Sequence, residues 1–267
     1  MTASRYAYSN ASGHAGDHHT ALAELLDGAS GQRVGGLLDL AGKRCLEVGA
    51  GGGSFALWLA EQVGPTGTVL ATDITPRPVA AHPRLTVIAH DVTTDAIPEA
   101  GSWDVIHARL LLNHLPERRK VLAVLAAALA PGGYLVTEDF WSEPPASWVA
   151  FAPDRADRAL LRDYHTAVLK VLDAHGNSRA WAAEAYTAMR EEGLVSVETT
   201  VAARSWPGGG PGARLLAATL NQTRGDLIDI GGLDPAQLDR VQELLGDPDV
   251  VLHGHRMYTT SGRKPIG

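Results

Sequence analysis

The sequence has a single cysteine, Cys45, among its 267 residues. One thiol cannot form an intramolecular disulfide, and it supplies too few thiolates for the usual structural zinc site. The absence of disulfides is typical of a reducing compartment. We therefore expect a cytoplasmic protein whose stability comes from its apolar core.

Long apolar runs and basic tracts are also missing. The longest purely apolar stretch, residues 121–130, is about half of the roughly 20 residues that a membrane-spanning helix needs. The first residues lack the apolar segment of a signal peptide. The chain has 23 Lys and Arg against 30 Asp and Glu, a net charge of −7, and its longest basic tract is residues 118–120. We expect neither a membrane nor a nucleic-acid partner, so a small molecule is the expected partner.

What is present is a globular composition, with 45% hydrophobic and 20% charged residues. The length exceeds the usual single domain of about 100 to 200 residues, although α/β folds commonly run longer as one unit. These values predict one large domain that carries an insertion.

Short apolar, strand-like segments alternate with segments of helical periodicity in the first half of the chain. The strand-like segments are residues 45–49, 69–73, 85–91, 103–109 and 134–140. Strands separated by helices in this order predict right-handed crossovers and a parallel sheet covered on both faces. The first half is therefore predicted to be a doubly wound α/β sheet.

The helices of the first half are predicted from apolar spacing and from breakers. We expect an extended polar arm up to about residue 19, then a helix whose pattern is interrupted at Gly28 and Gly31 and resumes beyond them. A further helix is predicted over residues 116–130, with Pro116 in its first turn.

The second half departs from the strand and helix alternation. Helices are predicted over residues 154–173, 181–192, 214–227 and 235–245, and strands over residues 194–201 and 249–260. The last two strands are expected at an edge of the sheet, with helices inserted between them.

The most informative segment is the glycine cluster that follows the first strand, residues 46–54. A glycine turn between a strand and a helix allows close approach of a ligand to the backbone, and the helix N-terminus offers unpaired amides. The dinucleotide-binding fingerprint, Gly-x-Gly-x-x-Gly, would need its third glycine at Ser54. The pattern present instead is Glu-x-Gly-x-Gly-x-Gly, from Glu47 to Gly53.

This pattern resembles motif I of the class I S-adenosylmethionine-dependent methyltransferases, and the resemblance covers roughly residues 40–140. It implies a Rossmann-like doubly wound sheet of seven strands, mostly parallel, with an antiparallel last strand. It also implies an N-terminal cap over residues 1–40 and a methyltransferase domain over residues 41–267. Residues 141–180 and 208–246 would then be helical insertions on the acceptor side.

The resemblance implies S-adenosyl-L-methionine as cofactor and a set of residues that contact it. Asp73 would bind the ribose hydroxyls, Asp91 and Val92 would bind and flank the adenine, and Arg109 would contact the amino-acid end. The implied set is Glu47, Gly49, Ala50, Gly51, Ser54, Asp73, Ile74, Asp91, Val92 and Arg109. Two structural alternatives stay open, with Asp73 as a helix N-cap before Pro76 and Asp91 as a simple turn former.

A second string, His-Ala-Arg-Leu-Leu-Leu-Asn-His-Leu-Pro-Glu-Arg over residues 107–118, is similar to bacterial methyltransferases of specialised metabolism. This subset implies a small acceptor, aromatic or indole/alkaloid-like, methylated on O, N or C. The resemblance does not identify the acceptor or its nucleophilic atom, and we allow for a homodimer.

Methyl transfer from a sulfonium is an in-line displacement, so the protein must chiefly position the acceptor and exclude water. A base is needed only if the acceptor has to lose a proton. The candidates are His114, Asn113 and Tyr8, the first because a pKa of roughly 6.5 suits general-base chemistry. Alternatively, His114 is a helix-start residue bonded to backbone, Asn113 caps that helix, and Tyr8 packs in the lid.

We expect no metal, because His253 and His255, at two-residue spacing, would lie on a late strand remote from the glycine cluster. Two other functions remain open from sequence. One is a Rossmann-type NAD(P)-dependent oxidoreductase, and the other is a non-catalytic partner protein that binds S-adenosylmethionine.

Overall fold

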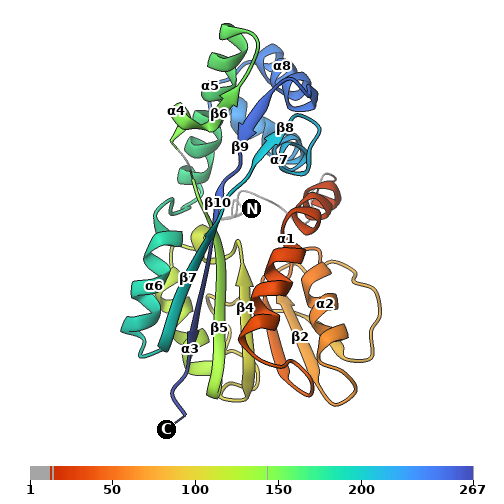
Figure 1. Ribbon diagram of the computed structural model, residues 1–267, viewed down its shortest axis with the longest axis vertical. Helices are drawn as coiled ribbons and strands as arrows, with labels where there is room; N and C mark the ends of the chain where they lie inside the picture. The colour runs from red at the N-terminus through yellow and green to blue at the C-terminus, as the bar shows by residue number, and fades with distance from the viewer. Residues whose placement is uncertain (1–12, 14, 143, 267) are drawn as a thin grey trace. The chain divides into compact units, whose positions relative to one another are not determined.

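The computed structural model describes residues 13, 15–142 and 144–266, and it divides the chain into two compact units (Figure 1). We call the first the sheet unit, and it comprises Leu26–Phe140, Ala180–Val201 and Met257–Gly267. The second, the helical unit, comprises Met1–Leu25, Trp141–Arg179 and Ala202–Arg256.

A seven-stranded sheet forms the centre of the sheet unit. Its strands lie in the order β3-β2-β1-β4-β5-β10-β7. The first five along the chain pair in parallel, and the last strand is antiparallel, so the predicted Rossmann-like fold class is confirmed. The strands are β1 (Arg44–Val48), β2 (Thr68–Asp73), β3 (Leu85–Ala89), β4 (Trp103–Arg109), β5 (Leu129–Trp141), β7 (Val195–Ala202) and β10 (Arg256–Arg263).

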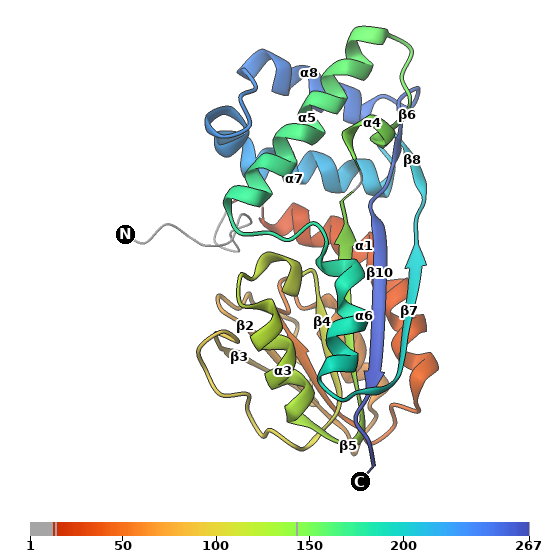
Figure 2. The same ribbon diagram turned by 90° about the vertical axis from the view of Figure 1, so that its left-hand side faces the viewer.

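Helices cover both faces of this sheet because successive residues of its central strands point to opposite sides. On one face, α2 (Ser54–Gln62) and the end of α1 (Ala15–Leu37) pack on a core that includes Cys45, Val105 and Val136. On the other face, α3 (Arg118–Ala128) and α6 (Trp181–Glu191) pack on Leu46, Ile106 and Leu135. Figure 2 shows α3 and α6 side by side over the sheet.

The prediction for the N-terminal region is wrong in two respects. A helix, α1, already begins at Ala15, where an extended arm was expected, and it continues through Gly28 and Gly31 without a break. Glycine in a helix costs about 1 kcal/mol relative to alanine, which is too little to end a helix that tertiary contacts support. Tertiary packing also explains why residue 31 is a glycine, because a Cβ there would lie 2.9 Å from Cζ2 of Trp58 on α2.

These two glycines give a matched test of that explanation. Gly28→Ala should raise the free energy of unfolding by about 0.5–1 kcal/mol, because no atom lies within 4 Å of the added methyl and the unfolded chain loses freedom. Gly31→Ala should lower it, because the methyl would overlap the Trp58 ring. Urea unfolding of both variants measures the difference, and equal effects would contradict the packing role of Gly31.

The helix predicted over residues 116–130 is shorter and starts later. A 3-10 turn, η1 (Leu112–His114), follows β4, and α3 begins at Arg118 with Glu117 as its N-cap, so Pro116 lies before the helix. The helix ends at Ala128 because β5 begins at Leu129, with a register shift in its pairing to β4.

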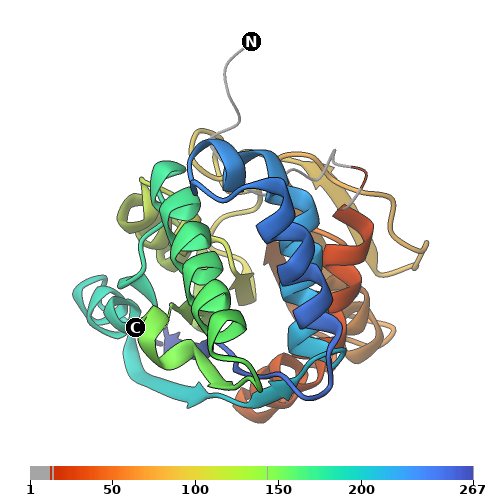
Figure 3. The same ribbon diagram turned by 90° about the horizontal axis from the view of Figure 1, so that it is seen from above.

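The helical unit consists of packed helices and a small antiparallel sheet. Its helices are α4 (Pro145–Trp148), α5 (Arg155–Ala174), α7 (Pro211–Asp229) and α8 (Pro235–Gly246), and its strands are β6 (Val149–Phe151), β8 (Ser205–Pro207) and β9 (Val251–His253). Figure 3 shows α5, α7 and α8 packed together around their own core. Asp154 and Asp234 cap α5 and α8 by accepting backbone N–H groups.

The four helices predicted in the second half of the chain are confirmed, with bounds shifted by a few residues. The predicted strand over residues 249–260 is instead two strands, β9 and β10, in different sheets. In the described part of the chain, no helix is long and apolar enough to cross a membrane.

Candidate active site

The glycine cluster forms a tight loop between β1 and α2. Gly49, Gly51 and Gly53 all have positive φ angles, of 72°, 55° and 77°, which residues with a Cβ rarely adopt. The backbone N–H groups of Gly49 and Ala50 both donate to the carbonyl oxygen of Thr72, at 2.8 and 2.9 Å. A Cβ on Gly53 would lie 2.3 Å from Cγ2 of Val79. The loop is therefore built around glycine, and Ser54 starts α2 directly after it.

Asp73 ends β2 beside this loop and holds it. One carboxylate oxygen accepts the N–H of Gly51 at 2.9 Å, and the other accepts the N–H of Thr75 at 2.9 Å. No helix follows, since residues 74–82 contain none, so the alternative that Asp73 caps a helix before Pro76 is wrong. The next residue, Ile74, has 69% of its surface exposed, a large apolar side chain presented at the same edge.

Asp91 lies in the turn after β3. Its Oδ1 accepts both the N–H of Thr93 at 2.9 Å and the hydroxyl of Thr93 at 2.6 Å, as a turn former does. Val92 is buried in the core beneath that turn. Their predicted contacts with an adenine ring stay a prediction.

Glu47 is held inside the sheet unit by a histidine. Nδ1 of His107 lies 2.7 Å from Oε2 of Glu47, and its Nε2 lies 3.4 Å from Oε2 of Glu138, with the histidine side chain fully buried. Burial alone would lower the pKa of His107, but the two carboxylates outweigh it and raise the pKa to about 9. The pKa of Glu138, which burial would raise, falls to about 2 because of His107, Ser30 and Arg109. The raised pKa favours the protonated form of His107, which lies buried between the Glu47 and Glu138 carboxyl groups.

Arg109 ends β4 and is bound by α1. Its guanidinium donates to Asp27 Oδ1 at 2.7 Å and to Ser30 Oγ at 2.9 Å, and it lies over the Phe55 ring, 5.3 Å from the ring centroid. Ser30 in turn donates to Glu138. Glu47 and Arg109 were predicted as site residues from the sequence, whereas the groups that hold them were not. The sequence did offer one signal for these groups, which is that polar residues occur at matching positions of strands that are otherwise apolar.

Asn113 and His114 lie in η1, directly after β4, and both are buried. The backbone N–H of Asn113 donates to Oδ1 of Asp139 at 3.3 Å, and that of His114 donates to the carbonyl of Leu111 at 3.0 Å. Burial raises the pKa of Asp139 to about 7, against the opposing effect of the Asn113 N–H. The structure thus places the two predicted catalytic residues together at the carboxyl edge of the sheet, with Asn113 bonded through its backbone to a buried acid.

Tyr8, the third predicted catalytic residue, lies outside the described residues. Of the other polar residues expected in the arm, His18 and His19 are in α1, with ring centroids 6.0 Å apart, and burial together with His19 lowers the pKa of His18 to about 4. Among residues 13, 15–142 and 144–266, no three His, Cys, Asp or Glu side chains are grouped to hold a metal. His253 instead bonds the Ser205 hydroxyl at 2.9 Å.

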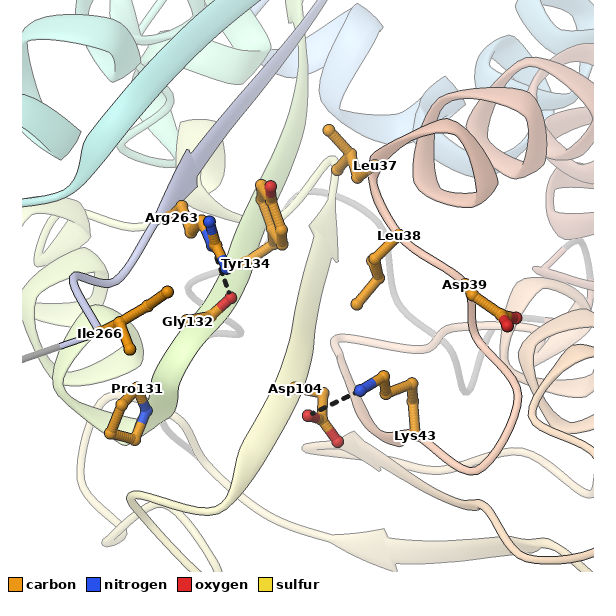
Figure 4. Close-up of a pocket in the computed structure, with 10 residues that line it drawn as sticks. All are labelled: Leu37, Leu38, Asp39, Lys43, Asp104, Pro131, Gly132, Tyr134, Arg263 and Ile266. Atoms are coloured by element: carbon orange, nitrogen blue, oxygen red, sulfur yellow. Dashed lines mark hydrogen bonds and ion pairs between the residues drawn. The ribbon is translucent and has the colours of Figure 1, made fainter.

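A groove of about 470 Å³ lies at the opposite edge of the sheet (Figure 4). It is near the start of β4, where Asp104 pairs with Lys43 at 3.7 Å, whereas the glycine loop and Arg109 are at the carboxyl ends of the strands. Arg263 closes one side by donating to the Gly132 carbonyl at 3.0 Å. This groove is separate from the candidate active site.

The comparisons with known proteins agree with this geometry. A family model described as "Methyltransferase domain" matches residues 18–207, which is more than half of the chain. The chain belongs to this methyltransferase-domain family, as the sequence predicted.

Similar proteins cover a range of acceptors by name. The chain is 40% identical over 103 residues to "Methyltransferase str2" of Strobilurus tenacellus, covering 38% of this chain and 37% of that protein. It is 30% identical over 116 residues to "Ribosomal RNA large subunit methyltransferase E" of Sorangium cellulosum, covering 38% and 55%. It is 34% identical over 102 residues to "Ubiquinone biosynthesis O-methyltransferase" of Vibrio parahaemolyticus, covering 36% and 43%. The matched regions thus span about a third to a half of these relatives.

A solved structure shares the fold. Phosphoethanolamine N-methyltransferase 2 of Haemonchus contortus, in complex with phosphomonomethylethanolamine and S-adenosylhomocysteine, superposes with a TM-score of 0.55 and 15% sequence identity. The match covers 90% of this chain and 52% of that one.

Proposed function

We propose that the protein transfers a methyl group from S-adenosyl-L-methionine to O, N or C of a small, aromatic or alkaloid-like metabolite. The observation that carries the proposal is the glycine loop with Asp73 bonded to the Gly51 amide and the exposed side chain of Ile74 beside it. A parallel α/β sheet binds its ligands at the carboxyl ends of its strands, and this constellation lies there.

The residues present fit this cofactor. The cofactor brings an activated methyl group, so the chain has only to bind and orient it. The loop glycines allow close approach to the backbone, Asp73 offers a carboxylate to ribose hydroxyls, and Ile74 offers an apolar surface to a ring. The carboxyl-edge location of Asn113 and His114 places them on the same side of the sheet as this loop.

The small-molecule acceptor is supported by charge and by one relative's name. A net charge of −7 disfavours a phosphate backbone as acceptor, although one relative is named for ribosomal RNA. The ubiquinone biosynthesis relative is named as an O-methyltransferase of a small-molecule pathway. A cytoplasmic location, membership of the bacterial natural-product subset, and a homodimeric assembly belong to the same proposal.

Isothermal titration calorimetry with S-adenosylhomocysteine and with NADH separates the proposal from the oxidoreductase alternative. We expect micromolar binding of the first compound and no binding of the second. Binding of NADH alone would overturn the proposal. Mass spectrometry of an aromatic and alkaloid acceptor panel then tests for a gain of one methyl group, and no turnover with intact cofactor binding would favour a non-catalytic partner.

His114 is the proposed general base. His114→Ala should reduce kcat about hundredfold or more with an O–H or N–H acceptor, because a positioned base typically contributes that much. Its affinity for S-adenosylhomocysteine should stay within twofold of the wild type. His82→Ala, which alters a histidine in the turn before β3, is the matched control and should change neither quantity. Unchanged turnover in His114→Ala would eliminate His114 as an essential base.

A further inference from the structure

Five ionisable side chains of alternating sign form a row in the sheet unit, with Glu138, His107 and Glu47 buried and Asp27 and Arg109 partly exposed. From α1 to β1 they are Asp27, Arg109, Glu138, His107 and Glu47. The row crosses three neighbouring strands because their register aligns it, with Glu47 opposite His107 and Glu138 opposite Arg109. It starts on a helix and ends two residues before the glycine loop.

The α1 end of the row is held by several hydrogen bonds. Ser30 accepts from Arg109 and donates to Glu138, so one hydroxyl joins the helix to two members of the row. Thr259 of β10 donates to the other oxygen of Glu138 at 2.9 Å. Nearby, Arg33 of α1 donates to Ser261 at 3.1 Å. Residues 26–37 of α1 are therefore tied to Glu138 through Ser30, in addition to the bond of Arg33.

The other end reaches the loop through β1. The carboxylate of Glu47 is fixed by His107, while its carbonyl oxygen accepts from the Thr72 hydroxyl at 3.3 Å. The carbonyl oxygen of Thr72 accepts hydrogen bonds from the backbone amides of Gly49 and Ala50. Thr72 therefore bonds both to the backbone of Glu47 and to the loop. A shift of the Glu47 side chain would be passed to the amides that shape the loop.

His107 is the only member of the row that contacts both Glu47 and Glu138. Glu47 on β1, Glu138 on β5 and the Phe55 ring on α2 lie against it, and Ser30 on α1 and Thr259 on β10 hold Glu138. Well-packed apolar residues would supply as much stability as such buried charges, so the specific gain from an ionic row is fixed geometry.

We propose that His107 is a positioning residue, which couples the packing of α1 against the sheet to the conformation of the glycine loop. Through Glu47 and Glu138, loss of the α1 contacts loosens the loop, and a ligand on the loop tightens residues 26–37. The ligand-binding part of this proposal rests on the function proposed above, whereas the coupling itself concerns only this chain's own residues.

A double-mutant cycle tests the coupling. Ser30→Ala and His107→Gln should each weaken S-adenosylhomocysteine binding about tenfold, measured by calorimetry. If the two residues act through one row, the double variant should also be about tenfold weaker, whereas independent effects would multiply to about hundredfold. Multiplied effects, or an unchanged affinity in Ser30→Ala, would overturn the proposal.

Glu198→Gln is the matched control, because it breaks an ion pair of α1, with Arg33 at 3.1 Å, that is not part of the row. Its affinity should stay within twofold of the wild type. An equal loss in this variant would show that any loosening of α1 weakens binding, against a specific role for His107.

A ligand-free measurement keeps this test separate from the proposed function. Hydrogen exchange of the amides in residues 49–54 should be at least tenfold faster in Ser30→Ala than in the wild type, and unchanged in Glu198→Gln. If the wild type does not bind S-adenosylhomocysteine, the proposed function fails, yet faster exchange still supports the coupling. Unchanged exchange in Ser30→Ala overturns the coupling whatever the ligand, even if His107→Gln does not fold.

Discussion

Asp73→Ala is expected to weaken binding of S-adenosylhomocysteine about hundredfold while leaving the fold intact. The variant removes a carboxylate that would accept two ribose hydroxyls, and hydrogen bonds to a charged group contribute roughly 1.5–3 kcal/mol each. It also releases the Gly51 amide that Asp73 holds at 2.9 Å. A hundredfold change corresponds to about 2.7 kcal/mol, close to the lower limit of about 3 kcal/mol for two such bonds. Calorimetry measures the affinity, and circular dichroism checks the fold.

Asp39→Ala is the matched control for this experiment. Asp39 accepts the N–H two residues ahead, that of Ala41 at 3.0 Å, as Asp73 does with Thr75. It precedes β1, at the opposite edge of the sheet from the glycine loop. The control should therefore retain full affinity. If both variants bind equally well, Asp73 is a turn former and the proposed ribose contact is wrong.

The sequence predicted the parts of this structure that are encoded locally. Strand, glycine turn and helix follow one another within residues 44–62, so composition and spacing were enough to place Gly49, Gly51 and Asp73 at one edge. The parallel pairing of β1 to β5 follows from the alternation of strands and helices. The helix boundaries were less accurate because the ends of α1 and α3 depend on what they pack against.

The buried row could not be predicted because it joins distant positions. Ser30 and Glu138 are 108 residues apart, and Glu47 and His107 are 60 apart. Their contact depends on strand register, and a shift of one residue would move His107 to the other face of the sheet. The motif resemblance therefore predicted Glu47 and Arg109 as ligand contacts, whereas the structure shows both side chains bonded within this internal network.

The same row has the largest expected effect on stability. His107→Leu should lower the free energy of unfolding by about 3–5 kcal/mol at pH 7, because it leaves the Glu47 and Glu138 carboxylates buried without their cation. Urea unfolding measures this loss. A loss below about 1 kcal/mol would show that the two acids are neutral or hydrated in the folded protein.

Stability should also fall as the pH rises from 7 to 9. The pKa of His107 is raised from 6.5 to about 9 on folding, so its contribution is complete below pH 6.5 and is lost as the pH rises through 9. The slope should reach at most about 1.4 kcal/mol per pH unit. Burial raises the pKa of Asp139 from 3.8 to about 7 and that of Cys45 from 9.0 to about 12, so both groups also lower stability as the pH rises, Asp139 in the lower part of this window and Cys45 in its upper part.

The remaining shifted histidines act at lower pH, because burial lowers the pKa of His18 to about 4 and that of His255 to about 3. The unfolded chain binds protons at these sites below about pH 6.5, so stability rises with pH there and the effect ends before pH 7. The difference in the pH 7–9 slope between the wild type and His107→Leu therefore isolates His107. His107→Leu should reduce the slope to the contributions of Asp139 and Cys45, whereas His253→Ala should keep the full slope because that exposed side chain bonds only Ser205 in the described contacts. An undiminished slope in His107→Leu would assign the titration to another group.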